Sequence, residues 1–311
     1  MSPVMAMPIH IPVLLEEVLG ALNVQPGKRY VDCTLGLGGH AKSILENSQP
    51  AGMLLGIDAD PDAIRLAKVT LADYTRTTIM VNDNFANLER ICKENDFLPV
   101  HGILLDLGIS SAQLEAPGRG FSFQYDSPLD MRFDPTQQLA ASDIVDTYTE
   151  NDLAHIIWNY GEERYSRRIA RYIINNRPIS STAKLAQTIE QAVGRRAEKI
   201  HPATRTFMAL RIAVNHELAN LASALEQAVN CLDHKGRLAV ISYHSLEDRI
   251  AKQFMMRESK ACLCPPDTPV CQCGHKPALA LISRKAIKPS PGEIALNPRS
   301  RSARLRTAER L

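Results

Sequence analysis

Short apolar runs alternate with amphipathic segments along the first third of the chain. The runs 30–33, 53–57, 78–81 and 102–105 have the length of buried strands, and polar residues follow each of them. Between these runs, residues 40–47, a segment that starts at Pro61, and residues 85–95 show helical periodicity. This alternation predicts an α/β fold with a doubly wound, mainly parallel sheet.

The next strong strand pattern is at residues 237–242, about 130 residues after the fourth run. A crossover needs far fewer residues, so the spacing indicates an inserted domain. The insert is helical: a capping box at 149–152 precedes an apolar periodic run, and 181–193 forms a second helix. Residues 202–232 are expected to form one long helix that returns to the sheet. We therefore predict a discontinuous core at 1–112 and 206–311, with a helical insert at 113–205 that binds the substrate.

The insert begins with a stretch, 115–135, that is rich in glycine, proline and aromatic residues. We expect this stretch to be a loop near a site and not part of a core.

Composition limits the class of protein. The chain has 311 residues, of which 45% are apolar and 23% charged, which suits one large domain or two ordinary ones. The sequence shows no apolar run long enough for a transmembrane helix and no signal-peptide pattern, so we expect a cytoplasmic protein. Seven cysteines, three of them in apolar surroundings (Cys33, Cys92 and Cys231), fit a reduced protein and not a disulfide framework.

Charge is distributed unevenly along the chain. Residues 1–160 hold 10 basic and 21 acidic residues, a net charge of −11, whereas residues 161–311 hold 26 and 13, a net charge of +13. Such polarity predicts that one part of the protein attracts polyanions. Basic clusters lie at 164–171, 195–205 and 299–310, and from them we expect Arg168, Arg171, Arg301 and Arg304 to contact nucleic-acid phosphates. A solvated helix face and a partly frayed tail are the alternatives.

The segment from Gly36 to Ala41 follows the first predicted strand and fits the relaxed dinucleotide pattern G-x-G-x-x-G/A. Asp58 lies about 20 residues further on, where a carboxylate would bind ribose hydroxyls. An NAD-dependent oxidoreductase is therefore one candidate, and a tight strand–helix turn without any ligand is another.

Three features favour S-adenosylmethionine over NAD. Asp32 precedes the turn, where it would repel a pyrophosphate but suit a sulfonium that carries an amino-acid tail. The segment from Asn82 to Phe85 offers hydrogen bonds and a ring face for an adenine. Asp106 follows the fourth strand and would place a carboxylate near the transferred methyl group. Methyl transfer is thus the leading hypothesis.

Nine separated motifs then occur in the order found in one known family: HIPVLLEEV, DCTLGLGGH, GIDADPDAI, LLDLGISSAQL, RGFSF, SPLDMR, HPATRTFMALRIAVN, YHSLEDR and NPRSRSARLR. From about residue 10 to residue 306 the chain closely resembles the bacterial 16S ribosomal RNA cytosine-N4 methyltransferase family. The resemblance implies a Rossmann-like class I methyltransferase with an inserted helical domain. It also implies methylation of a cytidine N4 amine in the decoding centre of 16S ribosomal RNA within the small subunit. A non-catalytic RNA-binding module remains an alternative.

The same resemblance implies a set of cofactor contacts. Carried over by motif, they are Gly38, Gly39, His40, Asp58, Phe85, Asp106 and Gln113. In this set the glycines would let backbone N–H groups approach the methionine part of the cofactor. His40 could instead be a core or capping histidine.

Catalysis requires that the weakly nucleophilic N4 amine be aligned with the methyl group and that its protons be accepted by hydrogen-bonding groups. Many amino-methyltransferases use a D/N-P-P-aromatic loop after the fourth strand, but this chain has Asp106 followed by LGISS. We expect carbonyls or hydroxyls of this loop, including those of Ser110 and Ser111, to hold the amine, with Asp106 behind them.

The segment after the fifth strand offers two rings, Tyr243 and His244, that could stack on an unstacked base. They could equally belong to a helix cap, and we favour Ser245 as the capping residue.

Four further cysteines, Cys262, Cys264, Cys271 and Cys273, could hold a structural zinc ion, although their C-x-C spacing is tighter than the usual C-x2-C. Reduced thiols in a proline-rich loop are the alternative, and methyl transfer itself needs no metal.

A homodimer is compatible with the sequence, as is a monomer.

Overall fold

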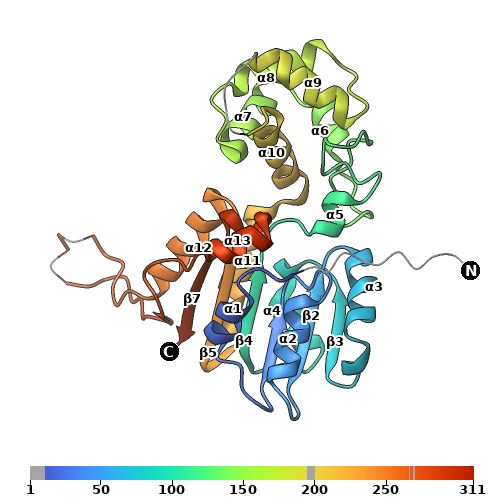
Figure 1. The fold of residues 1–311 in the computed structure, drawn as a ribbon. Helices are drawn as coiled ribbons and strands as arrows, with labels where there is room; N and C mark the ends of the chain where they lie inside the picture. The colour runs from blue at the N-terminus through green and yellow to red at the C-terminus, as the bar shows by residue number, and fades with distance from the viewer. Residues whose placement is uncertain (1–10, 195–199, 266, 269) are drawn as a thin grey trace, which may run out of the picture. The chain divides into compact units, whose positions relative to one another are not determined.

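The computed structural model describes residues 11–194, 200–265, 267–268 and 270–311, without the side chain of Ser111. The chain divides into two compact units, one formed by Met1–Gly108 with Ala219–Leu311 and the other by Ile109–Leu218. In Figure 1 the second unit is green to yellow. We had predicted an insert at 113–205. The expected basic residues Arg195, Arg196 and Lys199 lie outside the described residues.

The first unit is built on a seven-stranded sheet with the order β3-β2-β1-β4-β5-β7-β6, counted over the described residues. Its strands are β1 (Arg29–Asp32), β2 (Met53–Asp58), β3 (Thr78–Asn82), β4 (Val100–Asp106), β5 (Leu232–Ser242), β6 (Leu279–Leu281) and β7 (Arg304–Arg310). The first five strands are parallel, and β7 runs antiparallel to both β5 and β6. The predicted doubly wound α/β fold is confirmed. The strand order reverses between β1 and β4, and in such sheets ligands bind beyond the carboxyl ends of the strands at this point.

Helices cover both faces of this sheet, because successive strand residues point to opposite sides. On β4, Ile103 and Leu105 pack into a core with α4, α11 and α12, whereas Leu104 packs into a second core with α1, α2 and α3. The helical elements of the unit are α1 (Leu15–Leu22), α2 (Gly39–Asn47), α3 (Pro61–Thr70), η1 (Ala72–Tyr74), η2 (Phe85–Asn87), α4 (Leu88–Glu94), α11 (Glu217–Cys231), α12 (Ser245–Glu258), α13 (Pro291–Leu296) and η3 (Pro298–Ser302). The first two residues of α11 belong to the second unit.

The second unit is helical and has its own core. Its helices are α5 (Ser111–Glu115), α6 (Ala141–Thr147), α7 (Glu150–Gly161), α8 (Ser166–Asn175), α9 (Thr182–Val193) and α10 (Ala203–Asn215). Thr149 caps α7, as the sequence predicted, and the predicted helix over 181–193 is α9, with Ser181 as its N-cap. The expectation that 115–135 stays outside a core is wrong in part, because Phe121, Leu129 and Met131 are buried in this one.

The predicted single helix over 202–232 is also wrong. Helix α10 ends at Asn215, His216 adopts a left-handed conformation with φ of 52°, and α11 starts at Glu217. The Arg211 guanidinium spans the break, with Nε 2.8 Å from the Glu217 carboxylate. Apolar periodicity continues through the break, and neither glycine nor proline marks it in the sequence.

The C-terminal arginines do not form a frayed tail, because Arg304–Arg310 is strand β7 of the sheet. Cys33, Cys92 and Cys231 are buried and unbridged, as expected. Over the described residues, none of the helices is both long and apolar enough to cross a membrane.

Candidate functional site

The glycine turn joins β1 to α2 at the carboxyl edge of the sheet. Gly36 and Gly38 have φ of 52° and 81°, which side chains rarely adopt. The Leu35 N–H donates to the Ile57 carbonyl at 2.9 Å, which ties the turn to β2. A Cβ on Gly39 would lie 2.7 Å from Pro12 Cγ. The turn therefore requires its glycines for shape, and it leaves the first N–H groups of α2 directed toward this edge.

Aspartates end three neighbouring strands beside this turn. Asp32 ends β1, Asp58 ends β2 and Asp106 ends β4. Asp58 Oδ2 accepts a 2.8 Å hydrogen bond from the Gly36 N–H, so this carboxylate also fixes the turn. Thr34 links the other two aspartates, since its Oγ1 accepts from the Asp106 N–H at 2.7 Å and its N–H donates to Asp32 at 3.1 Å.

Asp106 is held from two sides. The Tyr243 hydroxyl donates to Asp106 Oδ1 at 2.8 Å, and His40 Nδ1 lies 3.5 Å from Asp106 Oδ2. The other ring nitrogen of His40, Nε2, lies 3.0 Å from the Val13 carbonyl, which can only accept, so this nitrogen carries a proton. Nδ1 of a neutral ring is then an acceptor. The contact between His40 Nδ1 and Asp106 Oδ2 is therefore favourable only when one proton lies between them, carried either by the carboxyl group of Asp106 or by the imidazole of His40.

Burial controls the ionisation of this cluster. Desolvation raises the pKa of Asp106 to about 7, against the lowering effect of the Tyr243 bond, and raises the pKa of Asp32 to about 6. Desolvation lowers the pKa of His40, and Asp32 partly offsets that. Desolvation also raises the pKa of Tyr243 well above its usual range, so its hydroxyl stays protonated and keeps donating. The two carboxyl groups of Asp32 and Asp106 therefore titrate closer to neutrality than exposed carboxyl groups do, as groups in active sites often do.

The remaining predicted cofactor residues lie in two places. Phe85 opens η2 after β3, is half-buried against the core and follows the capping residue Asn84. Gln113 belongs to the second unit, where it forms a capping box with Ser110 at the start of α5. The Ser110 Oγ accepts from the Gln113 N–H at 3.2 Å, so the hydroxyl predicted to hold the amine takes part in a helix cap. The side chain of Ser111 is not described.

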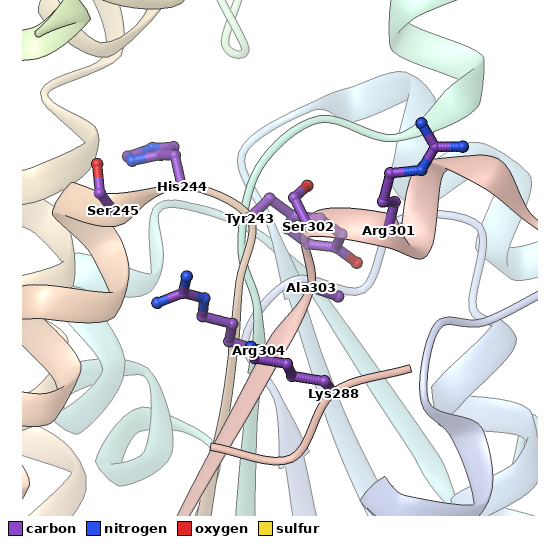
Figure 2. A pocket seen from close by; sticks show the side chains of 8 residues that line it. All are labelled: Tyr243, His244, Ser245, Lys288, Arg301, Ser302, Ala303 and Arg304. Carbon is purple, nitrogen blue, oxygen red and sulfur yellow. The ribbon is translucent and has the colours of Figure 1, made fainter. Parts of the chain in front are cut away.

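A basic pocket of about 170 Å³ lies beside the Tyr243 ring (Figure 2). It is lined by three segments of the first unit, namely Tyr243 to Ser245, Lys288, and Arg301 to Arg304. Lys288 and Arg301 are exposed and, among the residues that the structure describes, have no ion-pair partner. Arg304 donates to Asp248 at 2.9 Å. Sequence reasoning had singled out the arginines but missed Lys288, whose place is set by the bridge between Ile287 and Leu305 of β7.

A helix cap fixes the segment that presents Tyr243. His244, not the expected Ser245, is the N-cap of α12, and Ser245 is the first residue of the helix. Glu247 reaches back from the first turn, and its Oε2 accepts from the Tyr243 N–H at 2.8 Å. The preference for Ser245 was wrong because an imidazole nitrogen can accept the capping hydrogen bond as a hydroxyl does.

Two of the arginines expected to contact RNA, Arg168 and Arg171, lie on α8 of the second unit. The Arg168 guanidinium lies 5.8 Å from the Tyr172 ring centroid, and Arg171 Nε lies 3.3 Å from Glu150 Oε1. Both contacts are at the surface and leave donors for other partners.

The fold and the edge of its sheet define the class of protein. A positively charged cofactor with an amino-acid tail matches an edge with three carboxylates, where a pyrophosphate would be repelled. This is a class I, S-adenosylmethionine-dependent methyltransferase. The chain belongs to the MraW methylase family, whose family model matches residues 7–311. This membership decides between the two candidate cofactors in favour of S-adenosylmethionine.

Relatives are similar to the chain over nearly its full length. A Ribosomal RNA small subunit methyltransferase H from Dehalococcoides mccartyi is 60% identical over 302 residues, which cover 97% of this chain and 86% of the relative. One of the same name from Thermomicrobium roseum is 52% identical over 305 residues, or 97% and 94%. Among solved structures, an rRNA methylase from Streptococcus thermophilus is 12% identical with a TM-score of 0.43 and covers 99% of both chains.

Proposed function

We propose that this protein transfers the methyl group of S-adenosylmethionine to the N4 amine of a cytidine in the decoding centre of 16S ribosomal RNA, in the cytoplasm. The relatives' name supports ribosomal RNA of the small subunit as substrate. The observation that carries the proposal is the position of Tyr243. Its hydroxyl binds Asp106 at the cofactor edge, and its ring lines the basic pocket.

The residues of the carboxyl edge would hold the cofactor. Gly38 and Gly39 keep the turn open for backbone contacts, and the carboxylate of Asp58, which ends β2 beside the turn, would accept from the ribose hydroxyls. Phe85 offers a ring face for adenine. Gln113 belongs to the second unit, and its place among the cofactor contacts rests on the motif alone. His40 acts through Asp106, since both of its ring nitrogens face protein groups. Bound S-adenosylmethionine supplies an electrophilic methyl group and positive charge, which the aspartates balance.

The substrate amine needs acceptors for its protons as it attacks. In the proposed arrangement Asp106 acts as a carboxylate, and Tyr243 fixes its direction through the 2.8 Å bond. Gly108, with φ of 96°, lets the loop after β4 lie against the tyrosine, because a Cβ there would be 3.3 Å from Tyr243 Cδ2. Carbonyls of this loop are the further acceptors. The target base must leave its stack to react, and Tyr243 and His244 offer rings to receive it.

Phosphates of the RNA would bind the pocket cations. Replacing Lys288 and Arg301 together by alanine should weaken RNA binding and reduce the slope of log affinity against log salt by about 2. The control is the charge-matched pair Arg65→Ala and Lys68→Ala on α3, which should leave the slope unchanged. An unchanged slope in the pocket variant would remove the pocket from the RNA-binding surface.

The direct test is methyl transfer in vitro. The purified protein is incubated with labelled S-adenosylmethionine and either naked 16S RNA or small subunits from unmodified cells, and the RNA is digested to nucleosides. The expected product is N4-methylcytidine, absent with Asp106→Ala, whose folding is checked by thermal unfolding. RNA binding without transfer would indicate the non-catalytic alternative. Methylation at a ring carbon or on another base would contradict the proposal.

A further inference from the structure

The loop between α12 and β6 lacks a core of its own. Residues 259–277 connect the two elements, and the described residues among them have no helix or strand and no buried side chain. A backbone bond from the Ala278 N–H to the Glu258 carbonyl, at 2.8 Å, closes the base of the loop. In Figure 1 the loop, in orange, projects from the first unit. Ordered loops of this length are uncommon without something that holds them together.

Four cysteine sulfurs gather within this loop. The Sγ atoms of Cys262, Cys264, Cys271 and Cys273 all lie within 4.8 Å of one another. The Cys262 sulfur is 3.4 Å from that of Cys271 and 3.8 Å from that of Cys273, and the latter two are 3.6 Å apart. Four thiols from two ends of an exposed loop thus converge on one point.

These separations match a metal-centred tetrahedron. Zinc–thiolate bonds of about 2.3 Å place the sulfurs of a tetrahedron about 3.8 Å apart. A disulfide would instead bring two sulfurs to about 2.05 Å. The distances of 3.4 to 3.8 Å among the sulfurs of Cys262, Cys271 and Cys273 agree with three corners of such a tetrahedron, and the Cys264 sulfur, within 4.8 Å of each, supplies the fourth ligand. None of the four cysteines forms a disulfide.

Backbone N–H groups point at the sulfurs, as thiolate ligands require. The N–H groups of Leu263, Cys264 and Gln272 donate to the sulfurs of Cys273, Cys262 and Cys264, each at 3.4 Å. Such bonds stabilise the negative charge that a thiolate keeps when it binds a metal. The tight C-x-C spacing is therefore compatible with metal binding, because backbone N–H groups of both C-x-C segments donate to sulfurs of the cluster.

We propose that Cys262, Cys264, Cys271 and Cys273 form a structural Zn²⁺ site that orders the loop between α12 and β6. Four thiolates select a thiophilic ion over magnesium or calcium and fill the coordination shell, so the site is closed and not catalytic. Binding displaces the thiol protons and leaves a tetrathiolate centre with a net charge of −2. The site stands apart from methyl transfer and does not depend on the proposed function.

Metal analysis tests the site on the full chain, produced without a histidine tag and purified without chelator. We expect one zinc per chain, lost in the double variant Cys262→Ser, Cys271→Ser and retained in the control Lys276→Ser, an exposed residue of the same loop. Cobalt added to metal-free wild-type protein should give the visible absorption of tetrahedral cobalt thiolate. Because the cobalt spectrum uses the wild-type chain, it decides the matter even if the double variant fails to fold.

Limited proteolysis gives an independent readout. Trypsin should cleave after the exposed Lys260 faster when a chelator has removed the metal, and added zinc should restore protection. The proposal is overturned by a metal-free protein with four reactive thiols that takes up no cobalt, by a pair of disulfides, by iron in place of zinc, or by zinc that persists in the double variant.

Discussion

Removing one hydroxyl group at Tyr243 should shift the pH dependence of the reaction. Tyr243→Phe deletes the donor that lies 2.8 Å from Asp106 Oδ1 and keeps the ring. A hydrogen bond to a charged group contributes about 1.5–3 kcal/mol, and one pKa unit corresponds to about 1.4 kcal/mol. The pKa of Asp106, about 7 in the intact protein, should therefore rise by about one to two units. The ionised fraction at neutral pH then falls about five- to fifty-fold.

The assay is kcat/KM for methyl transfer, measured across the neutral and alkaline range. The acid limb of the Tyr243→Phe profile should move up by about one to two pH units, with activity recovering toward about pH 9. Tyr74→Phe is the matched control, because Tyr74 packs against the core of the same unit. A Tyr243→Phe profile that superimposes on the wild type, or a loss equal at every pH, would refute the assigned role of the Tyr243–Asp106 bond.

Three further predictions follow from the same edge of the sheet. Burial raises the pKa of Asp106 to about 7 in the folded protein, so the contribution of this residue to stability is fully present below its unfolded pKa and is lost as the pH rises through 7. Asp106→Asn removes the buried charge and should raise the unfolding free energy, measured with urea, by about 2–4 kcal/mol at pH 8. This gain should disappear toward pH 4. Gly39→Ala should lower the free energy of unfolding by about 1–3 kcal/mol and weaken cofactor binding, because the added Cβ would lie 2.7 Å from Pro12 Cγ. Its control is Gly20→Ala, which has open space around the added Cβ and should not lower the free energy of unfolding. Calorimetry should detect binding of S-adenosylhomocysteine but none of NAD, and the reverse would contradict the cofactor assignment.

The parallel core was predictable because its signals are local. Each strand is a short apolar run that ends in a polar residue, and Pro61 marks a helix start. The parallel topology then brings the strand ends together without further information. Asp32, Asp58 and Asp106 could therefore be placed at one edge of the sheet from the sequence alone.

The contacts that give this edge its chemistry were not predictable from local signals. Tyr243 and Asp106 are 137 residues apart, and only the pairing of β4 with β5 makes them neighbours. The sequence placed His40 beside the cofactor, but its bonds to Val13 and Asp106 depend on the path of the N-terminal segment. Side-chain partners of this kind depend on tertiary packing.

Local signals also failed where the backbone departs from its usual conformation. Apolar periodicity runs through His216, whose left-handed φ of 52° separates α10 from α11. The arginine-rich C-terminus resembles a solvated tail in composition, yet Leu305 and Ala308 are buried and make β7 part of the sheet. In both cases tertiary packing overrides the local pattern.

The central claim is tested most directly by mass mapping of 16S ribosomal RNA from cells that lack this protein. The account predicts that one decoding-centre cytidine loses a methyl group on N4, that the wild-type protein restores it, and that Asp106→Ala, produced at the same level, does not. A 16S RNA with unchanged methylation in the deletion strain, or a modification lost from a different kind of base, would contradict the account.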